Sequence, residues 1–154
     1  MPAVDDIDKH ILHELQVDGR LSNQELADRV GLSPSPCLRR VRLLEQRGLI
    51  TGYTAVVSGR EVGLPITAFV RLRLVSHAPE GVTVFEERVR GLAHVIEAYL
   101  LAGDHDYLLK VAVASFEAYE QFVRTQLRAI PGVESIETTF AYGTTKPPSP
   151  LPLG

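Results

Sequence analysis

The stretch LSNQELADRVGLSPSPCLRRVRLLEQRGL, residues 21–49, decides the fold of the N-terminal part of this chain of 154 residues. Ser22 can cap a helix, and Glu25, three residues later, can accept a hydrogen bond from the Ser22 amide, which makes a capping box. Gly31 supplies the positive φ at which such a helix ends. This order of residues predicts one short helix followed by a tight glycine turn.

A second helix should begin within the Ser-Pro-Ser-Pro segment, because Ser35 can cap it and Pro36 suits its first position. Cys37, Val41 and Leu44 stand at core-facing spacing. Cys37 is therefore interpreted as a small buried hydrophobe rather than as a catalytic or metal-binding thiol. Two helices joined by a tight turn form a helix-turn-helix, whose second helix enters the major groove of DNA. The sequence thus predicts a DNA-binding protein.

The charge distribution supports DNA binding only locally. The chain as a whole carries a net charge of -3, which argues against a general polyanion binder. Residues 33–60 hold five arginines against Glu45 alone, so their net charge is +4. Arginines near the start of the second helix can grip guanine O6 and N7, whereas Arg42 and Arg47 lie further along and suit phosphates. The candidate DNA-binding residues are Ser33, Ser35, Pro36, Arg39, Arg40, Arg42 and Arg47.

An earlier helix opens at Asp5-Asp6-Ile7-Asp8 and ends at Asp18-Gly19-Arg20, so three helices can bury one small core. The expected members of that core are Ile7, Ile11, Leu15, Leu26, Val30, Val41 and Leu44. After Gly48, the β-branched segment LITGYTAVV, residues 49–57, predicts a strand or a two-stranded wing that also links to the second half.

From Pro65 onward the hydrophobic period changes. The expected elements are a strand over 66–75, a helix over 82–92, strands over 95–102 and 107–114, a helix capped by Ser115, and a strand over 133–143. This order is the split βαβ, ferredoxin-like arrangement. The predicted fold is α+β, with a three-helix (winged) helix-turn-helix domain at residues 1–60 and a ferredoxin-like βαββαβ domain at 61–146. The proline-rich tail, 147–154, is expected to be extended rather than packed.

Such a sheet has helices on one face only. Apolar residues lie on both faces of the 95–102 strand, Tyr99 and Leu101 against Ala98 and Leu100. The uncovered face therefore needs a partner, and a homodimer that pairs sheet on sheet is the simple solution. The second helix of this half is expected to turn Phe116, Tyr119, Phe122 or Val123, Leu127 and Ile130 to the core.

Composition and missing motifs exclude several classes. No apolar run approaches the roughly 20 residues that span a bilayer, and the acidic N-terminus is no secretory signal. One cysteine excludes an internal disulfide, so a reducing cytoplasm is the expected setting. His10 and His13 stand at i, i+3 without a third ligand nearby, so neither a metal nor a cofactor is expected.

Enzyme motifs are missing as well, because the sequence holds no phosphate-binding glycine loop, no HExxH and no GxSxG. The alternative function is a small-molecule-binding ferredoxin-like module, or a small enzyme, without a DNA-directed role. DNA shift assays separate these alternatives from a DNA-binding regulator, and steady turnover of a metabolite would favour the enzyme.

Motifs over nearly the whole chain resemble the leucine-responsive regulatory protein and asparagine-synthesis regulator (Lrp/AsnC) family. They are DxxDxxILxxLQxDGR (5–20), ELADRVGLSPSPCLRRVRLLEQRGLITGYTAVV (25–57), AFV (68–70), AGDHDYLLKV (102–111) and LRAIPGVESIETT (127–139). The resemblance implies a bacterial or archaeal transcription regulator with an N-terminal helix-turn-helix domain and a C-terminal ligand-sensing domain. It also implies homodimers that assemble into octamers, with an amino acid effector bound between dimers. The proline-rich C-terminus departs from the family.

Taken alone, the segment Gly103-Asp104-His105-Asp106-Tyr107 predicts only a hairpin turn. The resemblance makes it a candidate effector site, since an aspartate can accept hydrogen bonds from an ammonium group and loop amides can hold a carboxylate. Two threonines of the last strand could add hydroxyls. The expected effector-binding residues are Gly103, Asp104, His105, Asp106, Tyr107, Thr138 and Thr139.

Overall fold

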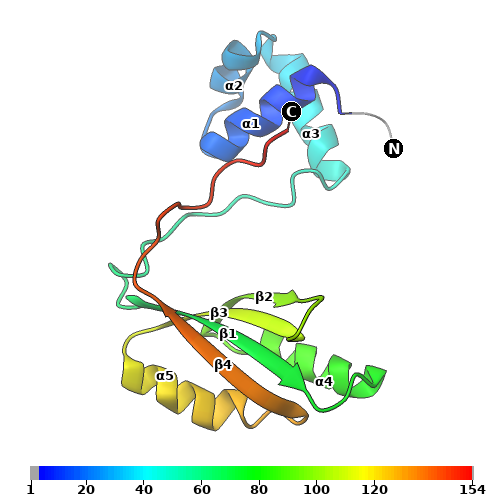
Figure 1. The fold of residues 1–154 in the computed structure, drawn as a ribbon. Coiled ribbons are helices and arrows are strands. Elements are labelled where there is room, and N and C mark those ends of the chain that lie inside the picture. The colour runs from blue at the N-terminus through cyan, green and yellow to red at the C-terminus, as the bar shows by residue number, and fades with distance from the viewer. Residues whose placement is uncertain (1–3, 154) are drawn as a thin grey trace. The chain divides into compact units, whose positions relative to one another are not determined.

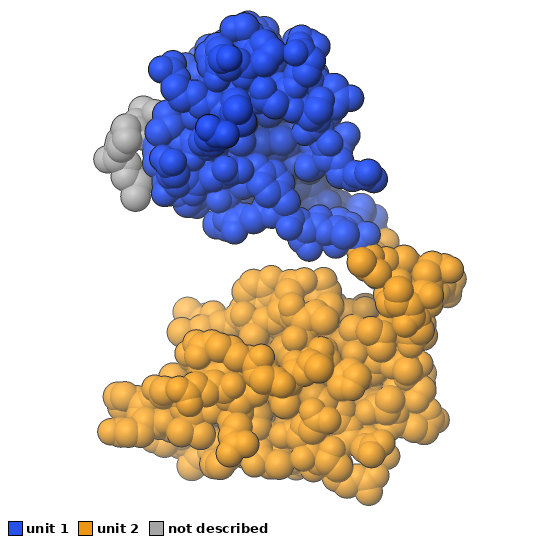
Figure 2. Space-filling view, turned by 180° about the vertical axis from the view of Figure 1, so that it is seen from behind, with its two compact units in different colours: residues 1–56, 145–154 blue, residues 57–144 orange. Residues whose placement is uncertain are grey.

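A computed structural model describes residues 4–153 of the chain. These residues form two compact units (Figures 1 and 2). The first unit contains the described residues up to Val56 together with those from Thr145 onward, and the second is Val57–Thr144. The chain therefore leaves the first unit once and returns to it at its C-terminal end.

The first unit is built on three helices, α1 (Asp6–Val17), α2 (Asn23–Val30) and α3 (Pro34–Gln46). The predicted capping box of α2 is confirmed: Ser22 Oγ accepts a hydrogen bond from the Glu25 amide at 3.2 Å, and the Glu25 carboxylate accepts one from the Ser22 amide at 2.8 Å. Gly31 ends α2 at a φ of 68°, in the left-handed region that a residue without a Cβ adopts at least cost.

The start of α3 corrects the sequence prediction by two residues. Ser33, not Ser35, is the N-terminal flanking residue, and Pro34, not Pro36, occupies the first helical position. Both prolines fit inside the first turn because the amides of that turn have no partner within the helix, so a missing N–H costs nothing there. No side chain caps this helix end.

The three helices close over a small apolar core, as predicted. Its fully buried members are Ile11, Leu26, Ala27, Cys37 and Leu44, and Ile7, Leu15, Val30 and Val41 pack against them half-buried. Cys37 is wholly enclosed, and this burial raises the pKa of its thiol because the thiolate would lose its hydration. That environment suits an inert packing residue and not a nucleophile.

The segment 49–57 forms neither the predicted strand nor a wing. It is irregular throughout, and Val56 and Val57 expose 95% and 63% of their surface. A β-branched sequence becomes a strand only when a second strand satisfies its backbone groups, and no described segment of this chain lies in register with it.

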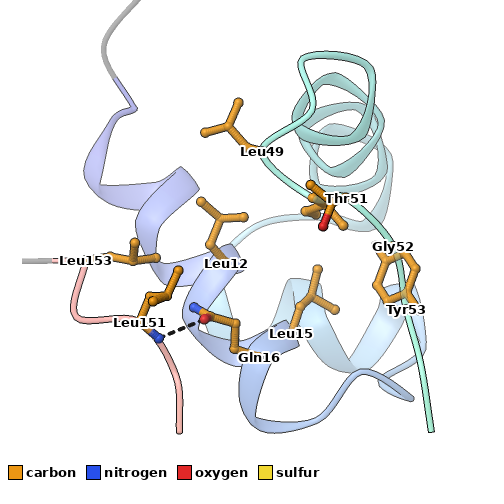
Figure 3. Close-up of a pocket in the computed structure, with 10 residues that line it drawn as sticks. Leu12, Leu15, Gln16, Leu49, Thr51, Gly52, Tyr53, Leu151 and Leu153 are labelled. Carbon is orange, nitrogen blue, oxygen red and sulfur yellow. Dashed lines mark hydrogen bonds between the residues drawn. The ribbon is translucent and has the colours of Figure 1, made fainter. Parts of the chain in front are cut away.

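The C-terminal tail is extended, as predicted, but the expectation that it does not pack is wrong. The Leu151 amide donates a hydrogen bond to Gln16 Oε1 of α1 at 2.8 Å. Figure 3 shows Leu151 and Leu153 beside the face of α1 that carries Leu12 and Leu15. They close one side of an apolar cavity of about 250 Å³. Leucines between the prolines of the tail thus have an apolar surface to cover.

The second unit is a four-stranded antiparallel sheet with helices on one face (Figure 1). Its elements are β1 (Ile66–Leu74), α4 (Pro79–Arg90), β2 (Val95–Leu100), β3 (Tyr107–Val113), α5 (Phe116–Phe122), the π-helical turn η1 (Val123–Leu127) and β4 (Val133–Ala141). The strand order β2-β3-β1-β4 confirms the ferredoxin-like βαββαβ prediction.

The core of this unit lies between the sheet and its two helices. Alternate residues of β1 and β3 enter it from the sheet: Ala68, Val70, Leu72, Leu74, Tyr107, Leu109, Val111 and Val113. From the helical side come Phe85, Val89, Tyr119, Phe122, Leu127 and Ile130. Phe116, also expected in the core, is instead 59% exposed and packs edge-on against Phe140. As the first residue of α5, it lies at the margin of the helix–sheet contact.

Candidate nucleic-acid interface and effector-binding region

The exposed side of α3 carries a stripe of polar residues with two leucines beside it. Ser35, Arg39, Arg42 and Gln46 follow one another at spacings of four, three and four residues, which places them on one helix face. With Leu38 and Leu43 they line a shallow surface groove of about 290 Å³. Guanidinium, hydroxyl and amide groups side by side on a helix are the groups that read base edges in a major groove.

The structure brings three of the seven predicted DNA contacts together here, namely Ser35, Arg39 and Arg42. Ser33 lies just before the helix and is exposed, whereas Pro36 is half-buried. Arg47 follows the helix as its C-terminal flanking residue and is exposed. The sequence predicted that Arg42, like Arg47, contacts phosphates. The structure instead places Arg42 on the same helix face as Arg39, so Arg42 joins the candidate base-reading arginines.

Arg40 is not the outward-facing residue that the sequence predicted. Its Nη1 donates to Asp8 Oδ1 at 2.7 Å and to Asp5 Oδ2 at 2.8 Å, so it fastens α3 to the start of α1. These carboxylates raise the pKa of the Arg40 guanidinium. The pKa of Asp5 falls, first because the Asp8 amide donates to it and then because of Arg40. Arg40 thus fixes the position of α3 against α1.

Two residues on this face of α3, Gln46 and Leu38, were not among the DNA contacts predicted from sequence. Gln46 can form a bidentate pair with adenine, and Leu38, 37% exposed, can touch a thymine methyl group. The spacing from Ser35 through Arg39 and Arg42 to Gln46 was readable in the sequence. Leucines in an amphipathic helix are usually assigned to the core, so Leu38 and Leu43 gave no such indication.

In the second unit, Asp106 holds the backbone of its own hairpin in place. Its Oδ2 accepts a hydrogen bond from the Leu74 amide at 2.7 Å, and its Oδ1 lies 2.7 Å from His77 Nε2. The Asp106 amide donates to the Leu72 carbonyl at 2.8 Å. The pKa of its carboxyl is lowered, first by the Leu74 amide and then by His77. This carboxylate is therefore a brace between the loop and the end of β1.

Tyr107 and Thr138 point to the helical side of the sheet. The Tyr107 hydroxyl donates to Glu86 Oε1 of α4 at 3.1 Å, and its ring centroid is 4.5 Å from that of Phe85. Burial, and then the Glu86 carboxylate, raise the pKa of Tyr107 to about 12. The Thr138 hydroxyl shares a hydrogen bond with the Tyr119 hydroxyl.

His105 and Thr139 belong to the opposite, open face. His105 Nε2 lies 3.3 Å from Glu137 Oε2, and Glu137 Oε1 accepts from Arg71 at 3.0 Å. Thr139 pairs across the sheet with Phe69 of β1. Gly103 and Asp104 are exposed, and the Asp104 carbonyl accepts a hydrogen bond from Arg73. Within one chain, the seven predicted effector residues are therefore divided between the loop and the two faces of the sheet.

Among residues 4–153, no three His, Cys, Asp or Glu side chains gather as a metal would require. No helix in the same range is long and apolar enough to cross a membrane.

Comparison with known proteins gives the same division of the chain. Residues 4–51 match the model of a winged helix-turn-helix DNA-binding domain, and residues 67–151 match the Lrp/AsnC ligand binding domain. The leucine-responsive regulatory protein of Escherichia coli K12 is 44% identical over 135 residues, which cover 88% of this chain and 82% of that protein. The leucine-responsive regulatory protein of Klebsiella pneumoniae aligns to the same extent.

Solved structures agree over almost the full length. A transcriptional regulator of Neisseria meningitidis in complex with L-Met has a TM-score of 0.93 at 37% identity, covering 98% of this chain and 97% of that one. An AsnC family transcriptional regulator of Agrobacterium tumefaciens has a TM-score of 0.91 at 36% identity, covering 97% of each chain. The chain belongs to the Lrp/AsnC family and is a DNA-binding transcriptional regulator with a ligand-binding domain.

Proposed function

We propose that α3 reads operator DNA through Ser35, Arg39, Arg42 and Gln46, and that Arg47 contacts a phosphate. The observation that carries this proposal is the single exposed face shared by the four side chains. Leu38 would add an apolar contact to a thymine methyl group. Arg40 is left out of the readout because two carboxylates already hold its guanidinium.

The test begins with selection of a binding sequence from random DNA, followed by fluorescence anisotropy on that sequence. Arg39→Ala and Arg42→Ala should each weaken specific binding by about 1–3 kcal/mol, or roughly 5- to 150-fold. Arg88→Ala, an exposed arginine of α4, is the matched control and should change nothing. Equal affinity of all four proteins would remove α3 from the interface.

We also propose that an amino acid is the effector and that it acts on operator affinity. The ligand-binding domain supports this, and so do a relative named for leucine and a solved neighbour that holds L-Met. Coupling between two sites is typically about 1–3 kcal/mol, so the effector should change operator affinity between roughly 5- and 150-fold. Anisotropy titrations with each proteinogenic amino acid in excess test this; no response to any of them would refute it.

The hairpin loop is the first candidate for the effector site, at a junction between subunits. Asp104 is exposed and can accept a hydrogen bond from an ammonium group, and His105 and Thr139 share the open face.

We infer a homodimer that forms through the open face of the sheet, where Phe69 is half-buried and Tyr99 is 51% exposed. We also infer that such dimers assemble into octamers. A chain that starts near Gly63 should sediment as a dimer or larger; a monomer at micromolar concentration would contradict this.

A further inference from the structure

The C-terminal tail makes a second connection between the two units. The chain passes from the first unit to the second at Val56–Val57 and returns at Thr144–Thr145. From Tyr142 to Ser149 every tail residue is exposed, whereas Pro150 and Leu153 are half-buried. The tail is therefore open to solvent over eight residues and then meets the surface of the DNA-binding unit.

The tail meets that unit at the apolar pocket of Figure 3. One wall of the pocket is a face of α1, and another is the segment 49–53. The Leu151 amide donates to Gln16 Oε1 of α1, and the side chains of Leu151 and Leu153 line the pocket. The occupant of this surface is thus a segment of the chain itself, seated by one backbone hydrogen bond and two leucines.

The segment 49–53 is the base of the linker that leaves the DNA-binding unit. Its first two amides donate to the Leu44 carbonyl, at 2.9 and 3.2 Å. Its last residue is Tyr53, whose hydroxyl donates to Glu45 Oε1 of α3 at 2.9 Å. Residues 54–58 are exposed and irregular. The tail therefore packs where the linker is still fastened to the helices, beside the point at which the linker departs.

A second connection changes how freely two units can move. A unit that is attached through one irregular segment can bend and twist about that segment, whereas a second segment from the same pocket limits both motions. Prolines at 147, 148 and 150 favour a stiff, extended tail that rises about 3.1 Å per residue. Eight residues span at most roughly 28 Å. A seated tail therefore cannot follow the DNA-binding unit through a large rotation.

We propose that the tail is a strap, and that its seating on the DNA-binding unit narrows the range of half-site separations that the protein binds. A dimer places two α3 helices in major grooves about one helical turn, or a multiple of it, apart. Restraint leaves fewer arrangements, so the effective concentration of the second helix is high at a matching separation and low at others. This inference rests on the proposed DNA readout and homodimer.

The seat is shallow, so the strap can be detached without disturbing the helices. Leu151 remains 67% exposed, and neither Leu151 nor Leu153 belongs to the core that the three helices enclose. Replacing both leucines should therefore release the tail while the first unit stays folded. The tail also offers a matched control, because Ser149 is exposed and does not line the pocket.

The test uses duplexes that carry two copies of the selected half-site, with the separation changed one base pair at a time over about one helical turn. The measured quantity is the spacing ratio, the Kd at the worst separation divided by the Kd at the best. In the double variant Leu151→Asp, Leu153→Asp, the ratio should fall roughly three- to tenfold. Its affinity for a single half-site should be unchanged. Ser149→Asp adds a charge to the tail but keeps both leucines, so it should keep the full ratio.

A second variant separates restraint from local packing. About eight Gly and Ser residues inserted after Gly143 double the exposed stretch and leave the seat intact. A strap that acts by restraint becomes slack, so the spacing ratio should fall while the unfolding temperature of the first unit stays the same. A tail that only supports the pocket would keep the ratio of the unchanged chain.

Four results overturn the proposal: a spacing ratio near one in the unchanged protein, an unchanged ratio in both variants, a ratio that falls in the double variant but not after the insertion, or an equal loss of affinity for the single half-site. Failure of the readout by α3 appears in a different measurement. Arg39→Ala should weaken binding to the single half-site and leave the spacing ratio nearly unchanged, because it alters a contact with DNA and not the restraint.

Discussion

Helix α3, proposed to read DNA, and the hairpin loop of the ligand-binding domain differ in how well their side-chain positions could be predicted from sequence. On α3, three of the seven predicted residues, Ser35, Arg39 and Arg42, lie on one face, whereas Arg40 pairs with two carboxylates of α1 and its N-terminal flank. Around the loop, seven residues chosen for their chemistry are spread over both faces of a sheet. A site on one helix can be read by counting, whereas a site on several strands depends on their pairing.

Strand geometry explains the difference. Successive side chains of a strand point to opposite faces, so Thr138 and Thr139 cannot both line one pocket on one side of β4. Thr138 bonds to Tyr119 under the helices, and Thr139 lies on the open face beside Phe69. The alternation of β4 was visible in the sequence, but which residues faced the helices was not.

The largest effect expected concerns the independence of the two cores. Phe85→Ala should lower the free energy of unfolding of the second unit by about 3–5 kcal/mol, because it empties a fully buried site. Ile11→Ala should cost the first unit about 2–5 kcal/mol for the same reason. Scanning calorimetry should show that each variant moves its own transition. A single unfolding transition whose midpoint both variants lower equally would show that the two units do not unfold independently.

Arg40 gives the next largest effect and tests the assignment of arginines on α3. Arg40→Ala leaves the Asp8 carboxylate, only 8% exposed, without its guanidinium partner, and should cost the first unit about 1–3 kcal/mol. Arg39→Ala should leave the stability of that unit nearly unchanged while weakening DNA binding. Urea unfolding and anisotropy on both variants check this. A stable Arg40→Ala protein that loses operator specificity would return Arg40 to the base-reading set.

Most of the fold was predictable because its indications are local. The capping box of α2, the Ser115 cap of α5, the turn at Gly31 and the alternation of β1 each lie within a few residues of sequence. The irregular conformation of 49–57 and the packing of the tail were not predictable, because both depend on whether a distant segment offers a partner. The bracing contacts of Asp106 were not predictable for the same reason, since its carboxylate pairs with the Leu74 amide and with His77, some 30 residues earlier in the chain.

Asp106 should produce a smaller, pH-dependent effect. Its folded-state pKa lies below the ordinary value of 3.8, so its contribution to stability is fully present above that value. The contribution is lost as the pH falls through the lowered pKa. Asp106→Asn should therefore be less stable at neutral pH and should lose less stability on acidification to about pH 3. Unfolding curves across this range check it, with Asp104→Asn as the control. Parallel pH profiles for Asp106→Asn and the unchanged protein would contradict the bracing role.

The smallest effect expected is at the contact between Gln16 and the tail, where the hydrogen bond to the Leu151 amide is exposed. Gln16→Ala should cost the first unit less than about 1 kcal/mol, because water competes for both groups. Sharper evidence comes from a cycle with a chain that ends at residue 149. If the tail packs on α1, Gln16→Ala should cost nothing further in the shortened chain, since its partner is gone. Gln24→Ala, which removes a bond to Asp28 within α2, should cost the same in both lengths. Equal costs of Gln16→Ala in the two chains would mean that the tail does not pack on α1.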